Sequence, residues 1–293
     1  MDKKIVNWFE VHEPKPHLDS NLKTDNQEII DDDRLVGIEV ELENSNVKMR
    51  NKSTVWVAHN DGSLRNTGLE WITHPIRARD APAALHDLFS GGANQCSFTP
   101  RTSIHVHFNC CDLTKDQVLD ILMLYLHFER QLYGYVGKNR VKNIYCVPIN
   151  DTTLARSILV NRFDVSVGRW KKYTGLNLLP LRDKGTMEFR QMHGTSNTTK
   201  VAVWIRLIDR LFQFVLKSNS GEIRKRLSNT WTVDDLTQLG KDVFLDDWKY
   251  LSTTPTMYDA FSAKQCFITG KEANKIDLQT YHTSPFATFK AGV

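Results

Sequence analysis

The sequence predicts an α+β fold in which a mostly antiparallel β-sheet is flanked by helices. Short segments with strand character come in pairs, and turn-forming residues join the members of a pair. Segments with helical periodicity separate these pairs, an arrangement typical of antiparallel sheets in α+β domains. No internal repeat or low-complexity segment interrupts the pattern.

Six segments are expected to form strands, because they alternate with a period of two or are rich in β-branched and aromatic residues. They cover residues 34–43, 54–58, 69–73, 103–109, 173–180 and 186–192. Asn60-Asp61-Gly62 is expected to turn the chain after the second strand, and residues 182–185 to turn it between the last two.

Three segments are expected to form helices. Asp80 is placed to act as the N-cap of a short helix that runs to Phe89. Thr114 is placed to cap a long helix whose apolar residues recur at helical spacing as far as Leu132. Residues 199–217 form a strongly amphipathic pattern with one apolar face.

The same patterns divide one large domain into three parts. Residues 1–33 are polar, end in three consecutive aspartates and are expected to form an irregular leader. Residues 34–217 hold the strong strand and helix patterns and are expected to form the core. Residues 218–293 have weaker helical patterns and are expected to pack on the same domain as an extension. Residues 138–172 are basic and show no clear period, so no element is predicted there.

Composition excludes several classes of protein. The 293 residues are 41% hydrophobic and 25% charged, fractions that exclude collagen-like, fibrous and disordered chains. The net charge of +4 is too small to indicate a nucleic-acid partner. No apolar run is long enough to cross a membrane, and the first residues lack the apolar segment of a signal peptide. Five cysteines without framework spacing favour reduced thiols, so we expect a cytoplasmic protein.

The first predicted strand places Glu39, Glu41 and Glu43 on one face, because side chains two residues apart share a face. Three neighbouring carboxylates repel one another unless water or cations compensate their charge. Hard oxygen ligands of this kind suit Mg²⁺ or Mn²⁺. The alternative is that the three acids form the solvent-exposed face of an edge strand, which is at least as common.

Two other strands carry polar pairs. His105 and His107 share a face and could bind a metal or a phosphate, although strand histidines are more often hydrogen-bonded structural residues. Glu188 and Arg190 also share a face. They form either a simple ion pair or a metal ligand beside a phosphate-binding guanidinium. Glu70 on the strand over 69–73 is, taken alone, a surface residue.

On all these strands the polar groups alternate with apolar residues. This pattern favours a shared metal centre, because acids without a compensating charge are not stable among hydrophobic neighbours. Sequence signatures of other chemistries are absent: no P-loop, dinucleotide-binding, nucleophile-elbow or Cys-x-x-Cys motif occurs. Cys110 and Cys111 are adjacent and do not suit a zinc site.

An ordered set of short motifs resembles the amidoligase family. The motifs are Val36-Gly-Ile-Glu-Val-Glu-Leu42, Asn60-Asp-Gly-Ser-Leu64, Gly68-Leu-Glu-Trp-Ile-Thr-His-Pro75, Ser103-Ile-His-Val-His-Phe-Asn109, Gly175-Leu-Asn-Leu-Leu179 and Gly185-Thr-Met-Glu-Phe-Arg190. The resemblance extends from Arg34 to Arg210. Family members occur in bacteria and phages and are carboxylate–amine ligases related to glutamine synthetase and glutamate–cysteine ligase.

The resemblance implies a glutamine synthetase-like fold, with residues 34–217 as the catalytic core and the sheet forming a funnel around ATP and Mg²⁺ or Mn²⁺. The metal ligands that it implies are Glu39, Glu41, Glu70, His105 and Glu188. The residues expected to act on ATP or in catalysis are Arg190, Glu188 and His107, with Asn177, Arg169 and Lys171 as further ATP contacts. Ser103 departs from the family pattern, which commonly has glycine there, and the role of Glu43 does not carry over.

The implied reaction joins a small-molecule or peptide carboxylate to an amine. The γ-phosphoryl group of ATP first moves to the carboxylate, and the amine then displaces phosphate to form an amide. The basic stretch that contains Arg156, Arg162, Arg169, Lys171 and Lys172 is either a solvated surface or a binding surface for phosphates or an acidic substrate.

Two other functions remain open at the level of the sequence. The first is a binding or regulatory protein on a retained ligase scaffold, since a fold alone does not establish an activity. The second is a metallohydrolase built on His105 and His107, which leaves the acids of the first strand and Arg190 unexplained. Neither the substrates nor the oligomeric state can be read from the sequence.

Overall fold

The computed structural model describes residues 3–19, 22, 33–45, 53–152, 154, 158, 163–230 and 232–251. Asp31 and Asp32 of the predicted leader lie outside the described residues, as do Arg156 and Arg162 of the basic stretch. The last part of the predicted C-terminal extension, residues 252–293, also lies outside them.

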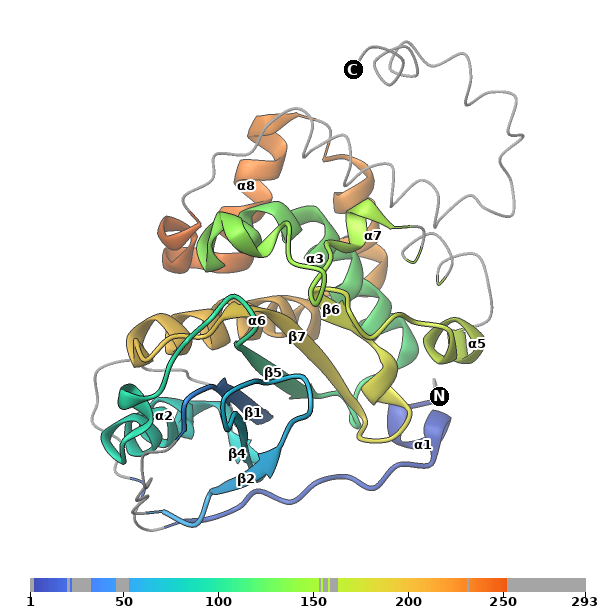
Figure 1. Ribbon diagram of the computed structural model, residues 1–293. Helices are drawn as coiled ribbons and strands as arrows, with labels where there is room; N and C mark the ends of the chain where they lie inside the picture. Colours follow the sequence, from blue (N-terminus) through green and yellow to red (C-terminus); the bar gives the residue numbers. More distant parts are fainter. Residues whose placement is uncertain are drawn as a thin grey trace.

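A seven-stranded sheet forms the centre of the part of the chain that the structure describes (Figure 1). Its strands are β1 (Leu35–Leu42), β2 (Trp56–Asn60), β3 (Leu69–Thr73), β4 (Ile76–Arg77), β5 (Ser103–Asn109), β6 (Leu176–Asn177) and β7 (Thr186–His193). The strand order is β2-β3-β1-β5-β7-β6, and β4 pairs with one end of β1. Every strand pairing is antiparallel, which confirms the predicted α+β class.

The acidic strand β1 lies inside the sheet, between β3 and β5. Its alternate residues Val36, Ile38, Val40 and Leu42 are almost completely buried in the hydrophobic core. The intervening acids lie on the opposite face and are also buried. The alternative of a solvent-exposed edge strand is therefore wrong.

Helices cover the core face of the sheet. The α-helices are α1 (Ile5–Phe9), α2 (Ala81–Ser90), α3 (Lys115–Val136), α5 (Phe163–Gly168), α6 (Thr198–Lys217), α7 (Ser220–Ser228) and α8 (Val233–Phe244). Short 3₁₀ helices are η1 (Ala78–Asp80), η2 (Ala93–Gln95), η3 (Lys138–Arg140), η4 (Ile149–Asp151), η5 (Leu179–Leu181) and η6 (Leu245–Tyr250). The helices predicted over 80–89, from Thr114 and over 199–217 correspond to α2, α3 and α6.

Aromatic side chains join α3 and α6 to the sheet. The Phe108 ring of β5 stacks on Phe212 of α6 with 4.9 Å between ring centroids. Phe189 of β7 makes edge contacts with Phe108, with Phe212 and with Tyr125 of α3. These contacts bury the apolar residues of β5 and β7 under the two long helices, so the polar residues of both strands must lie on the other face.

The helix starts agree only in part with the predicted caps. Thr114 and Gln117 form a capping box, in which each side chain accepts a hydrogen bond from the backbone of the other residue. Asp80 occupies the N-cap position of α2, but its side chain makes no capping hydrogen bond, because η1 already continues into the helix.

The helices after residue 217 pack on α3 and α6. Arg224 of α7 donates to the buried Asp120 of α3 at 2.9 Å. Phe128 of α3 contacts the Phe244 ring of α8 edge-on, with 5.0 Å between centroids. Asp247 of η6 accepts hydrogen bonds from both Arg206 and Arg210 of α6.

Two segments differ from the predicted pattern. The strand predicted over 173–180 is reduced to β6. Before it, the Gly175 carbonyl accepts from Arg190 of β7 but the Gly175 N–H donates to the Val147 carbonyl, and after Asn177 the chain turns into η5. The leader contains α1, which the sequence pattern does not indicate. Its Ile5 is fully buried and donates a backbone hydrogen bond to the Leu113 carbonyl.

No helix within the described residues is long and apolar enough to span a membrane. The four cysteines that the structure describes are Cys96, Cys110, Cys111 and Cys146, and all are free and buried.

Candidate active site

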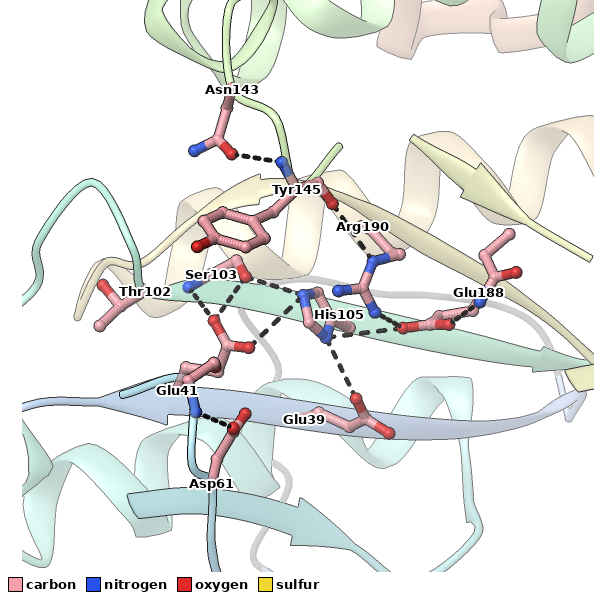
Figure 2. Close-up of polar contacts among 12 residues, drawn as sticks. Glu39, Glu41, Asp61, Thr102, Ser103, His105, Asn143, Tyr145, Glu188 and Arg190 are labelled. Atoms are coloured by element: carbon pink, nitrogen blue, oxygen red, sulfur yellow. Dashed lines mark hydrogen bonds and ion pairs between the residues drawn. The ribbon is translucent and has the colours of Figure 1, made fainter. Parts of the chain in front are cut away.

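The polar residues predicted on separate strands meet on the face of the sheet opposite α3 and α6 (Figure 2). The register explains the convergence, because β1 pairs Glu39 with His105 of β5 and Glu41 with Glu70 of β3. In the same way β5 pairs His107 with Glu188 of β7. These residues are called the carboxylate–histidine cluster below: Glu39, Glu41, Glu70, His105, His107 and Glu188.

Glu39 lies between the two histidines. Its Oε1 is 3.0 Å from His107 Nε2, and its Oε2 is 3.1 Å from His105 Nδ1. Burial alone raises the pKa of Glu39, but the His107 charge and the hydrogen bonds from both imidazoles outweigh it and hold that pKa well below its ordinary value. Glu39 is therefore an ionised carboxylate at neutral pH.

Glu188 is oriented by two donors. Asn177 Nδ2 of β6 donates to Glu188 Oε2 at 2.6 Å, and Arg190 forms an ion pair with Glu188 Oε1. The same Oε1 lies 3.6 Å from His105 Nδ1. Burial raises the pKa of Glu188, but the charges of His107, Arg190 and His105 together lower it below the ordinary value.

Ser103 connects Glu41 to His105. Its main-chain nitrogen and its hydroxyl lie 2.8 Å and 2.6 Å from Glu41 Oε2, and the hydroxyl also lies 2.7 Å from His105 Nε2. Each imidazole nitrogen of His105 thus faces a polar partner, which fixes the orientation of the ring.

Glu70 lies in the most negative part of the cluster. Burial, together with the charges of Glu39, Glu41, Asp61 and Glu188, raises its pKa to about 8. These four carboxylates repel the ionised form of Glu70. A bound divalent cation would remove this repulsion, so the residues fit a metal better than they fit a metal-free network.

Ligand atoms in the cluster are close enough to share cations. Three groups offer one ligand atom per residue with all atoms within 4.8 Å of one another. They are Glu39, His107 and Glu188; Glu39, Glu70 and His105; and Glu41, Asp61 and Glu70. Two of these sets combine two carboxylates with one imidazole and the third has carboxylates alone, and all three suit Mg²⁺ or Mn²⁺. Their overlap at Glu39 and Glu70 would allow more than one ion.

Arg190 reaches the cluster from a β-bulge. The register between β5 and β7 shifts so that Arg190 and Gln191 both lie opposite His105. The buried Arg140 donates to the main-chain oxygens of both bulge residues, at 2.9 Å to Arg190 and 2.8 Å to Gln191. The Arg190 Nε also lies 3.5 Å from the Tyr145 carbonyl oxygen. The bulge and its partners aim the guanidinium at Glu188.

The predicted site residues fall into two groups. All five predicted metal ligands, His107 and Arg190 come together, and Asn177 joins them through Glu188. Arg169 and Lys171 have exposed side chains on the segment between α5 and β6, and their contact with ATP stays a prediction. Glu43 directly follows β1, and its carboxylate accepts a hydrogen bond from the Arg65 backbone at 2.9 Å, which explains it as a structural residue.

Several members of the site are not predicted from the sequence. Asp61 is predicted only as a turn residue, although the Asn-Asp-Gly motif places a carboxylate beside the strand that carries Glu70. Lys184 has an exposed side chain whose Nζ lies 3.8 Å from Glu39 Oε1, and no pattern singles it out. Arg140 lies within residues 138–172, for which no secondary structure is predicted. Its function becomes apparent only from its hydrogen bonds to the β-bulge.

Residues 66–212, about half of the chain, match the family model described as "Putative amidoligase enzyme". The chain belongs to this family. As an amidoligase family member, the protein is an enzyme of the ligase type. The match contains Glu70, both cluster histidines, Glu188 and Arg190, whereas β1 with Glu39 and Glu41 precedes it. A search of curated proteins gives no match.

Proposed function

We propose that this amidoligase is an ATP- and Mg²⁺-dependent carboxylate–amine ligase that forms an amide through an acyl phosphate. The observation that carries the proposal is the burial of three carboxylates and two imidazoles of the cluster on one sheet face, with Arg190 beside them. Buried acids in this number need cations, and an arginine at their edge suits a phosphate, whose oxygens match its planar fork.

The donor set fits divalent cations held by Glu39, Glu41, Glu70, His105 and Glu188. When bound, they would neutralise charge on the phosphates of ATP. The contacts around these side chains support this assignment, because Asn177 and Ser103 donate hydrogen bonds to Glu188 and Glu41. Such partners fix the direction of ligand atoms and raise metal affinity.

The proposed reaction has two steps. An oxygen of the substrate carboxylate attacks the γ-phosphorus of ATP, and ADP leaves as the acyl phosphate forms. The nitrogen of the amine then attacks the acyl carbon, the bond to phosphate breaks, and the products are an amide and inorganic phosphate. Arg190 would stabilise the charge on the transferred phosphoryl group. The buried position of the cluster would exclude water, which otherwise hydrolyses the acyl phosphate.

His107 is the proposed acceptor for the proton that the amine loses. Its Nδ1 lies 2.9 Å from the Thr186 hydroxyl and its Nε2 lies 3.0 Å from Glu39. A carboxylate next to an imidazole stabilises the imidazolium that forms when the ring takes a proton. Asn177, Arg169 and Lys171 remain the proposed contacts of ATP outside the cluster.

A screen for ATP-dependent amide formation tests the proposal. The protein is incubated with Mg²⁺, ATP and pools of amino acids, peptides and amines, and new amides are sought by mass spectrometry. We expect an amide with stoichiometric ADP and phosphate from the intact protein and at most about 1% of this rate from Glu188→Gln. Normal ATP turnover by Glu188→Gln would contradict the assignment. Binding of ATP without turnover in any pool would favour a binding or regulatory protein instead.

A further inference from the structure

A series of buried hydrogen bonds runs from the β-bulge of Arg190 into α3. The side-chain amide of Gln191 donates to the Tyr125 hydroxyl, and this hydroxyl donates to Glu129 Oε1 at 2.9 Å. Gln191, Tyr125 and Glu129 are almost completely buried, and we call them the buried network. Because Tyr125 and Glu129 belong to α3, the network lies behind the sheet, on the face opposite the carboxylate–histidine cluster.

Glu129 ties the buried network to a segment of backbone. Its Oε1 and Oε2 accept hydrogen bonds from the main-chain nitrogens of Ile149 and Asn150, at 2.7 Å and 2.9 Å. The Asn150 side chain donates in return to the Leu126 carbonyl of α3 at 3.0 Å. A buried carboxylate is stable where several donors compensate it, as they do here. The acceptor of the Tyr125 hydroxyl is thus fixed by backbone donors.

The Tyr125 hydroxyl also packs against the residue that pairs with Arg190. The Arg190 N–H donates to the Gly175 carbonyl at 2.7 Å. A Cβ atom at Gly175 would lie 2.9 Å from the Tyr125 hydroxyl and 3.1 Å from Gln191 Cγ, so the close approach requires glycine. The buried network therefore contacts the backbone partner of Arg190 as well as the next residue of the bulge.

Stability of the core does not by itself account for Gln191. The side chain is fully buried, and no described residue donates to its amide oxygen. An unpaired buried acceptor destabilises a fold, and an apolar side chain of similar size would avoid this loss. What the amide supplies is the hydrogen bond that joins the bulge to Tyr125.

We propose that Gln191, Tyr125 and Glu129 are positioning residues that hold the β-bulge so that the Arg190 guanidinium faces the phosphate groups of a bound nucleotide. This inference rests on the proposed function, in which Arg190 binds phosphate. The network acts through the backbone of the bulge and not by contact with the ligand. Its effect on binding follows from geometry, because a guanidinium and a phosphate bond most strongly when the two forks are aligned.

Calorimetric titration with Mn²⁺ alone, and with tripolyphosphate at saturating Mn²⁺, tests the inference. Tyr125→Phe removes only the hydroxyl. We expect it to weaken tripolyphosphate binding about tenfold, while Mn²⁺ alone binds as it does to the intact protein. Gln191→Met removes the amide at the other end of the same hydrogen bond and should cause a similar loss. The double variant should bind tripolyphosphate about as weakly as either single variant, because both substitutions break one interaction.

Tyr135→Phe is the matched control. It removes another hydroxyl of α3, one that donates to the Lys200 carbonyl at 2.8 Å. This variant should lose some stability and keep both affinities. A residue with a merely structural role behaves in the same way, since it lowers the free energy of unfolding without changing the affinity of the folded protein.

The outcomes separate this inference from the proposed function. Unchanged tripolyphosphate binding by Tyr125→Phe would overturn the inference while the ligase proposal stands. Equal weakening of Mn²⁺ and tripolyphosphate binding would also overturn it, because the network would then act on the whole cluster and not on Arg190. Failure of the intact protein to bind tripolyphosphate with Mn²⁺ would contradict the proposed function and this inference with it.

Discussion

The guanidinium of Arg140 donates a hydrogen bond of 2.9 Å to the main-chain oxygen of Arg190. A second bond from Arg140 Nε reaches the Gln191 oxygen at 2.8 Å. Two successive carbonyls of a β-bulge are thus satisfied by one buried side chain. Because the bulge directs Arg190 toward Glu188, Arg140 holds the proposed phosphate-binding residue in position without touching the cluster.

Replacing Arg140 should therefore affect stability and the site together. Arg140→Ala leaves two buried carbonyls without donors, and we expect a loss of about 2–4 kcal/mol in the free energy of unfolding. Urea denaturation measures this loss. Arg79→Ala removes an exposed ion pair with Asp33 and should cost less than about 1 kcal/mol. Equal losses from the two variants would contradict the role given to Arg140.

Asn177 is expected to raise the affinity for divalent cations through Glu188. Asn177→Ala removes the 2.6 Å hydrogen bond to Glu188 Oε2, and we expect Mn²⁺ to bind about 10- to 100-fold more weakly in a calorimetric titration. Asn219→Ala is the control, because it removes an asparagine hydrogen bond at the start of α7, away from the cluster. That variant should lose some stability and keep its Mn²⁺ affinity, and a similar loss of affinity in both would refute the prediction.

Ser103 departs from the glycine that the family commonly has before the histidine pair. Ser103→Gly removes the hydroxyl between Glu41 and His105 but keeps the backbone N–H that donates to Glu41. We expect a stability loss of about 1–2 kcal/mol and a change in Mn²⁺ affinity of less than about tenfold. A loss beyond about 100-fold would mean that the hydroxyl itself is a ligand.

His127 should make the protein sensitive to acid. Its ring is buried in α3, and burial lowers its pKa from about 6.5 to about 4, despite the hydrogen bond to the Met123 carbonyl. Between these values the unfolded chain binds a proton that the folded chain does not, so stability falls as the pH falls from about 6.5 to about 4. The full difference corresponds to about 3 kcal/mol.

His127→Leu should remove this dependence. Urea denaturation at several pH values should show a smaller loss of stability below about pH 6.5 in this variant than in the intact protein. His86→Leu, at an exposed position of α2, should leave the pH dependence unchanged. The same acid sensitivity in His127→Leu and the intact protein would show that other groups cause it.

The strands β1, β5 and β7 are well predicted from the sequence, because apolar and polar residues alternate along most of their length. The same alternation is enough to place Glu39, His105 and Glu188 on the polar faces of their strands. The order of the strands in the sheet cannot be predicted from this alternation. The acids of β1 are buried because β1 pairs with β3 and β5, which excludes the edge-strand alternative. This pairing cannot be predicted from the sequence of β1 alone.

Residues that act through main-chain contacts escape prediction for a different reason. Arg140 binds carbonyl oxygens, and the β-bulge that it supports leaves no periodic signal in the sequence. The strand predicted over 173–180 is too long, because its ladder with β7 covers Leu176 and Asn177, whereas the Gly175 N–H donates to the Val147 carbonyl. In both cases long-range backbone pairing decides the structure, and local patterns do not record it.

The most direct test of the carboxylate–histidine cluster as a metal and nucleotide site compares substitutions of two glutamates, Glu39 in β1 and Glu43 directly after it. Calorimetric titration with MnATP should show binding to the intact protein and at least about tenfold weaker binding to Glu39→Gln. Glu43→Gln should bind as the intact protein does, because its amide oxygen can still accept the hydrogen bond from the Arg65 backbone. Equal affinity of Glu39→Gln and Glu43→Gln for MnATP would contradict the central claim.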